Sequence, residues 1–253
     1  MRLLFDTSNM HKKFAALALA AVVSAAPLGA APLTGNGVER LSYAWHLKGG
    51  FTWLAKLAFP SSGRGTLETH ESNTVHSQLT IQGNEPRSFY LYESSMMPEG
   101  SRTLSSRNAY SFGDDARDER VAFDPAKQVA QVQRFTNDGH ETKLKKLESA
   151  APQDVLTSIY YLRQHADEIR TPKKTEIFSG ANGYDVLYVP KPAMTMRVSG
   201  ADVRVRPFTI KPVDADKSKI GEVRVWLTDD AQRVPVRIDI EQKYATLKLE
   251  LDR

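Results

Sequence analysis

Residues 222–251 read EVRVWLTDDAQRVPVRIDIEQKYATLKLEL, and apolar and polar side chains alternate along three runs of this stretch. An alternation with a period of two is typical of a β-strand with one buried and one exposed face. Asp229-Asp230-Ala231-Gln232 separates the first two runs and has the composition of a turn. The apolar positions are Val223, Val225 and Leu227, then Val236, Ile238 and Ile240, then Leu247, Leu249 and Leu251. The stretch therefore predicts three antiparallel strands.

The same alternation extends back along the chain to Glu39. Asn137-Asp138-Gly139 joins residues 128–136 to residues 140–147, and Asn182-Gly183 precedes residues 184–189, so both supply the positive φ angles of tight hairpins. Counting the runs gives about a dozen closely spaced strands, and a sheet of that length must curl or close. We expect a mostly β protein with a strongly curved antiparallel sheet or a partly open β-barrel.

One segment has helical periodicity instead. Its apolar side chains Val155, Leu156, Ile159, Leu162 and Ala166 recur at helical spacing. Pro152 suits a first turn, Asp154 lies near the positive end of the helix dipole, and Arg163 lies near the negative end. The pattern predicts one helix over about 152–167, which we expect to pack on the concave face of the sheet.

Three polar stretches, 99–106, 113–119 and 212–219, are expected to be surface loops. None is long enough to separate two domains. We therefore expect one β-rich domain over residues 31–253.

The N-terminal residues have a different composition from the rest. His11, Lys12 and Lys13 precede the apolar run 14–23, and small residues fill 24–31. This is the layout of a secretory signal peptide, and an apolar run of about ten residues is roughly half of what crosses a bilayer. We expect residues 1–30 to be a signal peptide, cleaved after Ala30 or alternatively after Ala25, and translation from Met10 would also fit.

The charges and the absence of cysteine restrict the possible functions. Lys and Arg total 34 against 30 Asp and Glu, a formal net charge of +4, and removing residues 1–30 lowers it to +2. This balance gives no reason to expect a nucleic-acid partner. The chain has no Cys, so it has no disulfide, thiol nucleophile or lipid-attachment cysteine. Together with the leader, this predicts a periplasmic protein that is not a lipoprotein, with no membrane-spanning segment in the mature chain.

Motifs for catalysis are missing from the sequence. No Gly-x-Ser-x-Gly elbow or phosphate-binding glycine pattern occurs. We expect no enzyme activity and no cofactor. A hydrolase would need a convergent Asp, His and Ser set, for which His46, His76 and His140 are the candidate general bases.

Three clusters of histidine or acidic residues have the composition of metal or acid–base sites. His70 and His76 flank a predicted turn and fit exposed strand histidines better than metal ligands. Asp114, Asp115, Asp118 and Glu119 fit a solvated hairpin tip better than a cation site, because they lack the spacing of a calcium loop. Asp229 and Asp230 fit a turn better than a catalytic pair. No metal site is predicted.

Aromatic residues and one arginine are the candidates for ligand binding. Tyr43, Trp45, Phe51, Trp53 and Phe59 lie close together in the sequence, and they either line a pocket or belong to the core. Arg163 lies on the helix expected to face the sheet, where it needs either a carboxylate that ties helix to sheet or a ligand. The predicted ligand-binding residues are Tyr43, Trp45, Trp53, Ile159, Tyr160, Arg163 and Trp226.

Three segments carry a family resemblance. QDVLTSIYYLR at 153–163, GEVRVWLTDD at 221–230 and VPVRI at 234–238 resemble the family called domain of unknown function 3108. Tyr43-x-Trp45 with Gly49-Gly50 and the pair Phe123-Asp124 also fit its pattern. The resemblance implies a secreted or periplasmic β-rich bacterial protein and brings no known reaction. At the level of fold, such proteins are similar to curved-sheet envelope carriers such as the lipoprotein-localisation proteins.

Two functional hypotheses follow. The first is an envelope binding or carrier protein, because one helix is too small to cover the concave face of a dozen strands and would leave a cavity of several hundred cubic ångströms for a lipid-like or hydrophobic ligand. The second is an envelope structural or assembly factor that contacts another envelope protein through a sheet edge or its polar loops.

Overall fold

The computed structural model describes residues 37–49, 62–83, 88–112, 114–179, 182–215, 221–241 and 245–252. The expected signal peptide over 1–30 and the aromatic residues Phe51, Trp53 and Phe59 lie outside them. The first group of strands comprises β1 (Val38–Lys48), β2 (Ser62–Glu71), β3 (Val75–Gly83), β4 (Phe89–Met96), β5 (Thr103–Phe112), β6 (Asp115–Asp124), β7 (Val129–Thr136) and β8 (Gly139–Lys146). After the helix α2 (Val155–His165) come β9 (Lys173–Ser179), β10 (Asn182–Pro190), β11 (Met194–Val198), β12 (Ala201–Pro212), β13 (Val223–Thr228), β14 (Pro235–Glu241) and β15 (Thr246–Leu251).

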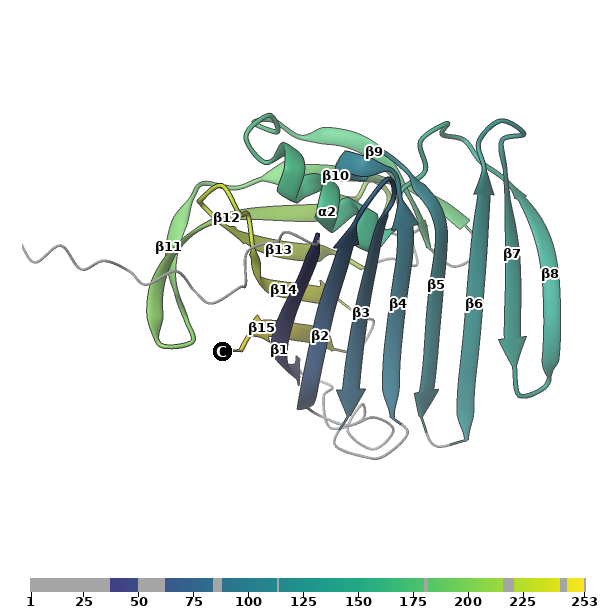
Figure 1. Ribbon diagram of the computed structural model, residues 1–253, viewed down its shortest axis with the longest axis horizontal. Coiled ribbons are helices and arrows are strands. Elements are labelled where there is room, and N and C mark those ends of the chain that lie inside the picture. Colours follow the sequence, from purple (N-terminus) through teal and green to yellow (C-terminus); the bar gives the residue numbers. More distant parts are fainter. Residues whose placement is uncertain are drawn as a thin grey trace, which may run out of the picture.

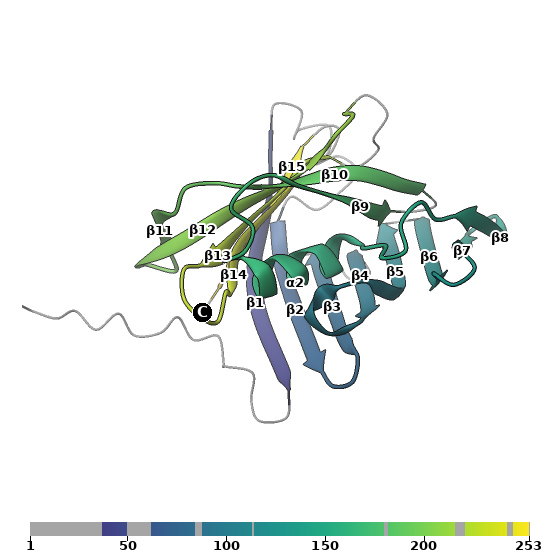
Figure 2. The same ribbon diagram turned by 90° about the horizontal axis from the view of Figure 1, so that it is seen from above.

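All these strands belong to one antiparallel sheet, in the order β8-β7-β6-β5-β4-β3-β2-β1-β15-β14-β13-β12-β10-β9, with β11 beside β12. Strand β1 pairs with β15, with Tyr43 opposite Leu251, and so joins the two groups of strands. The sheet bends into two layers whose strands run in different directions (Figure 1), and α2 lies between the layers (Figure 2). The expected curved, open sheet with a helix on its concave face is confirmed.

The alternation seen in the sequence determines which side chains face inward. Leu41, Tyr43 and Trp45 of β1 are buried, whereas the side chains between them are exposed. The apolar members of β13, β14 and β15 face them in the same core, as do Leu156, Ile159 and Leu162 of α2. The core therefore fills the space between the two layers and the helix.

The helix is shorter than expected, because Pro152 and Gln153 precede it in an extended conformation. Gln153 forms an isolated parallel bridge with Ile177 of β9. Asp154 is the N-cap, and its side chain accepts a hydrogen bond from the backbone N–H of Thr157. Among the described residues, no helix has the length and apolarity needed to cross a bilayer.

Two of the expected loops are wrong. Strand β5 begins at Thr103, within the stretch 99–106, and β6 begins at Asp115, within the stretch 113–119. The described residues form fifteen strands rather than about a dozen. Both strands carry polar side chains on their two faces, so their composition resembles that of a loop. Charged partners on neighbouring strands satisfy these side chains, as Arg107 of β5 does with Asp118 of β6. The stretch after Pro212, where β12 ends, does leave the sheet.

A glycine fixes the contact between α2 and the short 3₁₀ helix η1 (Pro98–Gly100). Gly100 has a φ of 65°, and a Cβ at this position would lie 2.8 Å from the backbone nitrogen of Tyr161. Both the positive φ and the close approach require glycine here. The segment between β4 and β5 is thereby held against the helix.

Candidate functional site

Arg163 joins α2 to β1 through a buried ion pair. Its two terminal nitrogens donate to the two carboxylate oxygens of Glu39 at 2.6 and 2.8 Å, and both side chains are less than a tenth exposed. Its remaining hydrogen bonds go to the backbone carbonyls of Gln232 and Arg233. Burial lowers the pKa of Arg163, but the bonds to Glu39 outweigh it, so the pKa lies above its usual value. Arg163 thus forms the ion pair that ties the helix to the sheet.

The other predicted residues near the helix are packed into the protein interior. The Tyr43 hydroxyl donates to the Pro235 carbonyl at 2.6 Å, and burial raises the pKa of Tyr43. Trp45 donates its indole N–H to the carbonyl of Gln82 at 2.7 Å, and Ile159 is buried in the main core. The Tyr160 hydroxyl donates to the Glu71 carboxylate of β2; burial, followed by this carboxylate, raises the pKa of Tyr160. The structure thus gathers Tyr43, Ile159, Tyr160 and Arg163 between α2, β1 and β2.

The start of α2 carries a second buried polar network. Asp154 accepts hydrogen bonds from the Thr157 backbone N–H at 2.7 Å and from the Ser94 hydroxyl. Burial raises the pKa of Asp154 despite these bonds. Gln153 donates to the Gly100 carbonyl at 2.8 Å and accepts from the Tyr188 hydroxyl. Sequence reasoning missed this network. The signal for it is the sequence Gln-Asp-x-x-Thr-Ser, which places four polar residues at the start of a helix that is expected to be buried.

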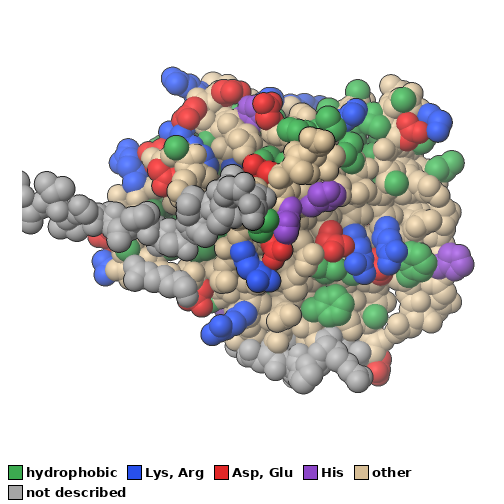
Figure 3. Space-filling view, in the orientation of Figure 1, with side chains coloured by type: hydrophobic (Ala, Val, Ile, Leu, Met, Phe, Trp, Pro, Cys, Tyr) green, Lys and Arg blue, Asp and Glu red, His purple; other side chains and the backbone are tan. Residues whose placement is uncertain are grey.

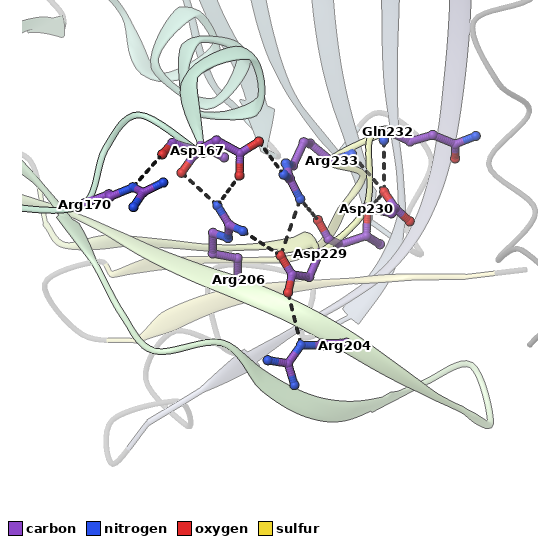
Figure 4. Close-up of polar contacts among 10 residues, drawn as sticks. Asp167, Arg170, Arg204, Arg206, Asp229, Asp230, Gln232 and Arg233 are labelled. Atoms are coloured by element: carbon purple, nitrogen blue, oxygen red, sulfur yellow. Dashed lines mark hydrogen bonds and ion pairs between the residues drawn. The ribbon is translucent and has the colours of Figure 1, made fainter.

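A cluster of charged residues lies at the other end of the helix (Figure 4). Arg206 contacts Asp167 at 2.6 Å and Asp229 at 2.8 Å, and Arg233 contacts Asp167 at 2.7 Å. Hydrogen bonds from Arg233 and Arg206 lower the pKa of Asp167. Asp230 instead accepts from the backbone N–H groups of Gln232 and Arg233, as a turn residue does. Asp229 is therefore bound by arginine side chains and Asp230 by backbone N–H groups of the turn, which agrees with the expectation that the two residues belong to a turn.

Among the residues that the structure describes, one hollow on the concave face, beside the start of α2, is small. It lies among Tyr92, Asn108, Asp154, Leu156 and Phe178 and has a volume of about 40 Å³. This is room for about one water molecule, whereas small-molecule sites occupy roughly 300–1,000 Å³. A cavity of several hundred cubic ångströms was expected on this face. This hollow is far smaller, and among the described residues large side chains such as Tyr43, Tyr188 and Phe208 pack in the core beneath the helix.

An apolar groove of about 600 Å³ lies on the outward face of β10, β12 and β13. We call it the Trp226 groove, and its apolar side chains are Leu187, Val189, Pro192, Met194, Pro207 and Trp226. Met194 is 47% exposed, and the Arg237 guanidinium lies 4.7 Å from the centre of the Trp226 ring. Lys191, Lys211, Arg224 and Glu222 also line the groove, and Arg224 is paired with Glu222 at 2.6 Å. The predicted residue Trp226 thus lies on the opposite side of the sheet from Tyr43 and Arg163.

A second outward hollow, of about 550 Å³, crosses strands β2–β7. We call it the polar trough. The strand register aligns its side chains in two rows, His70, His76, Ser95, Ser105, Ala122 and Gln131 in one, and Glu68, Gln78, Glu93, Arg107, Arg120 and Gln133 in the other. Figure 3 shows this face of the molecule, on which acidic, basic and histidine side chains are interspersed.

The histidines and the acidic residues are not arranged around a common point as metal ligands would be. His70 and His76 lie opposite each other on β2 and β3, and His76 bonds Ser95 at 2.8 Å. Of the acidic cluster, only Asp114 lies in the hairpin turn, because β6 begins at Asp115. Asp118 and Glu119 lie on opposite faces of β6, and each of them contacts two arginines. Within the described ranges, no three His, Asp or Glu side chains are grouped as a metal site would require. His46, His76 and His140 lie on β1, β3 and β8, which are not neighbours.

This chain, with its open and strongly curved antiparallel sheet and α2 on the concave face, has a β-barrel-like fold. Residues 52–252 match the family model "Protein of unknown function (DUF3108)", and the chain belongs to this family. A search against curated proteins gave no match.

One solved structure supports the fold class. The chain is similar to a β-barrel-like protein of domain of unknown function DUF1849 from Brucella abortus, with a TM-score of 0.54 and 12% identity over 86% of this chain and 97% of the other. A DUF1329 family protein from Desulfovibrio piger was also found, with a TM-score of 0.24 and 7% identity over 87% of this chain and 86% of the other. The first similarity shows that the fold is shared.

Proposed function

We propose that the protein is a non-catalytic binding protein of the bacterial envelope, exported by residues 1–30, and that it holds a lipid-like ligand in the Trp226 groove. The observation that carries this proposal is an apolar groove of about 600 Å³ on the outward face of the sheet, which is much larger than the hollow of about 40 Å³ that described residues form on the concave face. Open apolar surface of this kind marks ligand or partner sites in soluble proteins.

The rim of the groove favours an amphiphile with an anionic head. The groove is lined by three basic side chains, Lys191, Lys211 and Arg224, and by one acidic side chain, Glu222. Arg224 already neutralises Glu222. The two lysines can therefore pair with a carboxylate or phosphate while the acyl chain lies along Met194, Val189 and Trp226. A ligand bound here stays partly exposed, which suits a carrier that receives and delivers it.

Calorimetric titration of the purified protein with laurate tests the site. Trp226→Ala and Met194→Asp should each weaken laurate binding roughly tenfold or more, since one loses apolar contact and the other adds a repelling carboxylate. Leu144→Asp, on the exposed outer face of β8, is the matched control and should bind as the wild type does. Unchanged laurate affinity in both groove variants would exclude the site.

Fractionation of cells that express the full chain tests the location. The protein is expected in the periplasmic fraction with its mature N-terminus at Ala31 or Ala26. A cytoplasmic protein that keeps residues 1–30 would contradict export.

The assembly-factor function remains the second candidate because β8 is an edge of the sheet. Its Leu144 is 71% exposed, and Phe135 on the neighbouring strand β7 is 38% exposed. An unpaired strand edge beside apolar side chains can accept a strand from another protein. Crosslinking from position 144 in cells should capture one specific envelope protein if this function holds, and no adduct if it does not.

A further inference from the structure

We infer that the polar trough on the outward face of β2–β7 is a second binding site, separate from the Trp226 groove, and that it takes a linear, uncharged glycan lying across the strands. Nothing in the proposed lipid-like function uses this face.

The shape of the trough comes from the size of the side chains along its two rows. The centre of the first row holds the small residues Ser95, Ser105 and Ala122 on three neighbouring strands. The second row beside them holds the longer side chains of Glu93, Arg107 and Arg120. Small residues beside long ones leave a channel that runs perpendicular to the strands. Six strands at about 4.8 Å spacing give it a length of roughly 24 Å.

The guanidinium groups along the trough are fixed before any ligand arrives. Arg107 donates two hydrogen bonds to Asp118, both at 2.9 Å, and a third to Glu93 at 3.2 Å. Arg120 donates to the same Asp118 at 2.8 Å. His76 is likewise held by Ser95 and Thr74. Groups that are already ordered lose little conformational entropy on binding.

The charge of the two rows favours a neutral ligand. Each carboxylate of this face, on Glu68, Glu93 and Asp118, is paired with an arginine, so the charges balance; the arginines are Arg40, Arg107 and Arg120. The remaining polar members of the two rows are amides, hydroxyls and imidazoles. A nucleic acid or another polyanion would require an excess of Lys and Arg. Planar amide, carboxylate and guanidinium groups instead suit neighbouring hydroxyls of a sugar, which both donate and accept hydrogen bonds.

The spacing of the rows favours a glycan over a peptide. Each row offers one side chain per strand, about every 4.8 Å, which is close to the repeat of one sugar in an extended β-linked glycan. An extended peptide advances by about 3.4 Å per residue, so its polar groups would fall out of step with the rows. The strands beneath also use their own backbone groups in the ladder, so they offer a crossing peptide no main-chain partners.

Binding of two soluble probes, cellohexaose and N-acetylchitohexaose, tests the inference by calorimetry and by amide chemical shifts. At least one of them should bind the wild-type protein and shift the amide signals of β3–β6. Ser105→Trp and Ala122→Trp should weaken this binding roughly tenfold or more by filling the channel. Ser105→Thr and Ala44→Trp should keep it, the latter at an exposed position of β1 outside the trough. All variants should unfold at the wild-type temperature.

Three results would overturn the inference. The first is that neither hexasaccharide binds, and the second is that Ser105→Trp and Ala122→Trp bind like the wild type. The third is that an acidic polysaccharide or a peptide, rather than a neutral glycan, occupies the trough. Laurate should leave glycan binding unchanged, and Trp226→Ala should leave it intact, so failure of the Trp226 groove and failure of the trough are distinguishable.

Discussion

Glu39 of β1 and Arg163 of α2 form a two-pronged ion pair although 124 residues separate them in the sequence. Glu39 lies on the inward face of its strand, among Leu41, Tyr43 and Trp45, so its charge depends on the helix for a partner. The pair therefore ties α2 to β1.

Removing one member of this pair should strongly destabilise the protein. Arg163→Met leaves the Glu39 carboxylate buried without its partner and should lower the free energy of unfolding by about 3–5 kcal/mol. Adding Glu39→Gln to Arg163→Met should restore a large part of this loss, because the buried charge is gone. Urea unfolding of both variants measures the difference. A double variant no more stable than Arg163→Met would show that the stabilisation does not come from charge pairing.

Asp229 should contribute to acid sensitivity. Burial acts to raise the pKa of Asp229, but hydrogen bonds from Arg206 and Arg204 lower it below the usual value. A lowered folded-state pKa gives stability that is fully present above the unfolded pKa of about 3.9 and is lost as the pH falls through the lower folded pKa. Asp229→Asn should lower the free energy of unfolding by roughly 1–2 kcal/mol at pH 7. It should also make the free energy of unfolding fall less steeply as the pH is lowered. Urea unfolding from pH 7 to pH 2 measures both, with Asp138→Asn in the exposed β7–β8 turn as the control.

Asp154 should show the opposite pH dependence. Its pKa is raised by burial, so the folded state binds the proton more tightly and Asp154 favours folding more as the pH falls. Asp154→Asn keeps a capping oxygen without the charge and should remove this dependence with little loss at pH 7. Asp154→Ala loses the cap and should cost about 1–2 kcal/mol. Equal unfolding midpoints for the Asn and Ala variants would contradict the capping role.

Gly100 should tolerate substitution less well than Gly200. Both have positive φ angles, but a Cβ on Gly100 meets the backbone of Tyr161 whereas a Cβ on Gly200 meets nothing within 4 Å. Gly200→Ala should cost about 1 kcal/mol for the backbone conformation alone, and Gly100→Ala should cost about 1–3 kcal/mol more because η1 must move away from α2. Thermal unfolding of the two variants measures the gap, and equal losses would show that the contact is not tight.

Strands with one apolar and one polar face were predictable from the sequence, and β13, β14 and β15 are the best examples. Strands β5 and β6 were not, because Asn108 and Glu119 face inward where apolar residues normally stand. Their inward charges are satisfied by residues on neighbouring strands, as Glu119 is by Arg134 of β7. Such pairings depend on strand order and register, which composition does not contain.

The candidate site was predictable only in part. Sequence reasoning singled out Arg163 and gave an ion pair as one alternative, but the partner Glu39 lies too far along the chain to be identified by spacing. It also singled out Trp226, whose alternation with Val225 and Leu227 places it on the outward face. The small-residue channel of the trough was missed, because Ser95, Ser105 and Ala122 come together only through the registers of β4, β5 and β6.

The pairing of β1 with β15 also governs the order of events during folding. The seam at the middle of the sheet joins one of the earliest described segments to the last, so the chain must close a loop of about 200 residues before the seam can form. Until β15 arrives, β1 has an unsatisfied edge that other chains can pair with. In a newly made molecule, this edge of β1 must therefore be kept from pairing with other chains until β15 is in place. In a chain that ends before β15, the edge of β1 would stay unpaired permanently.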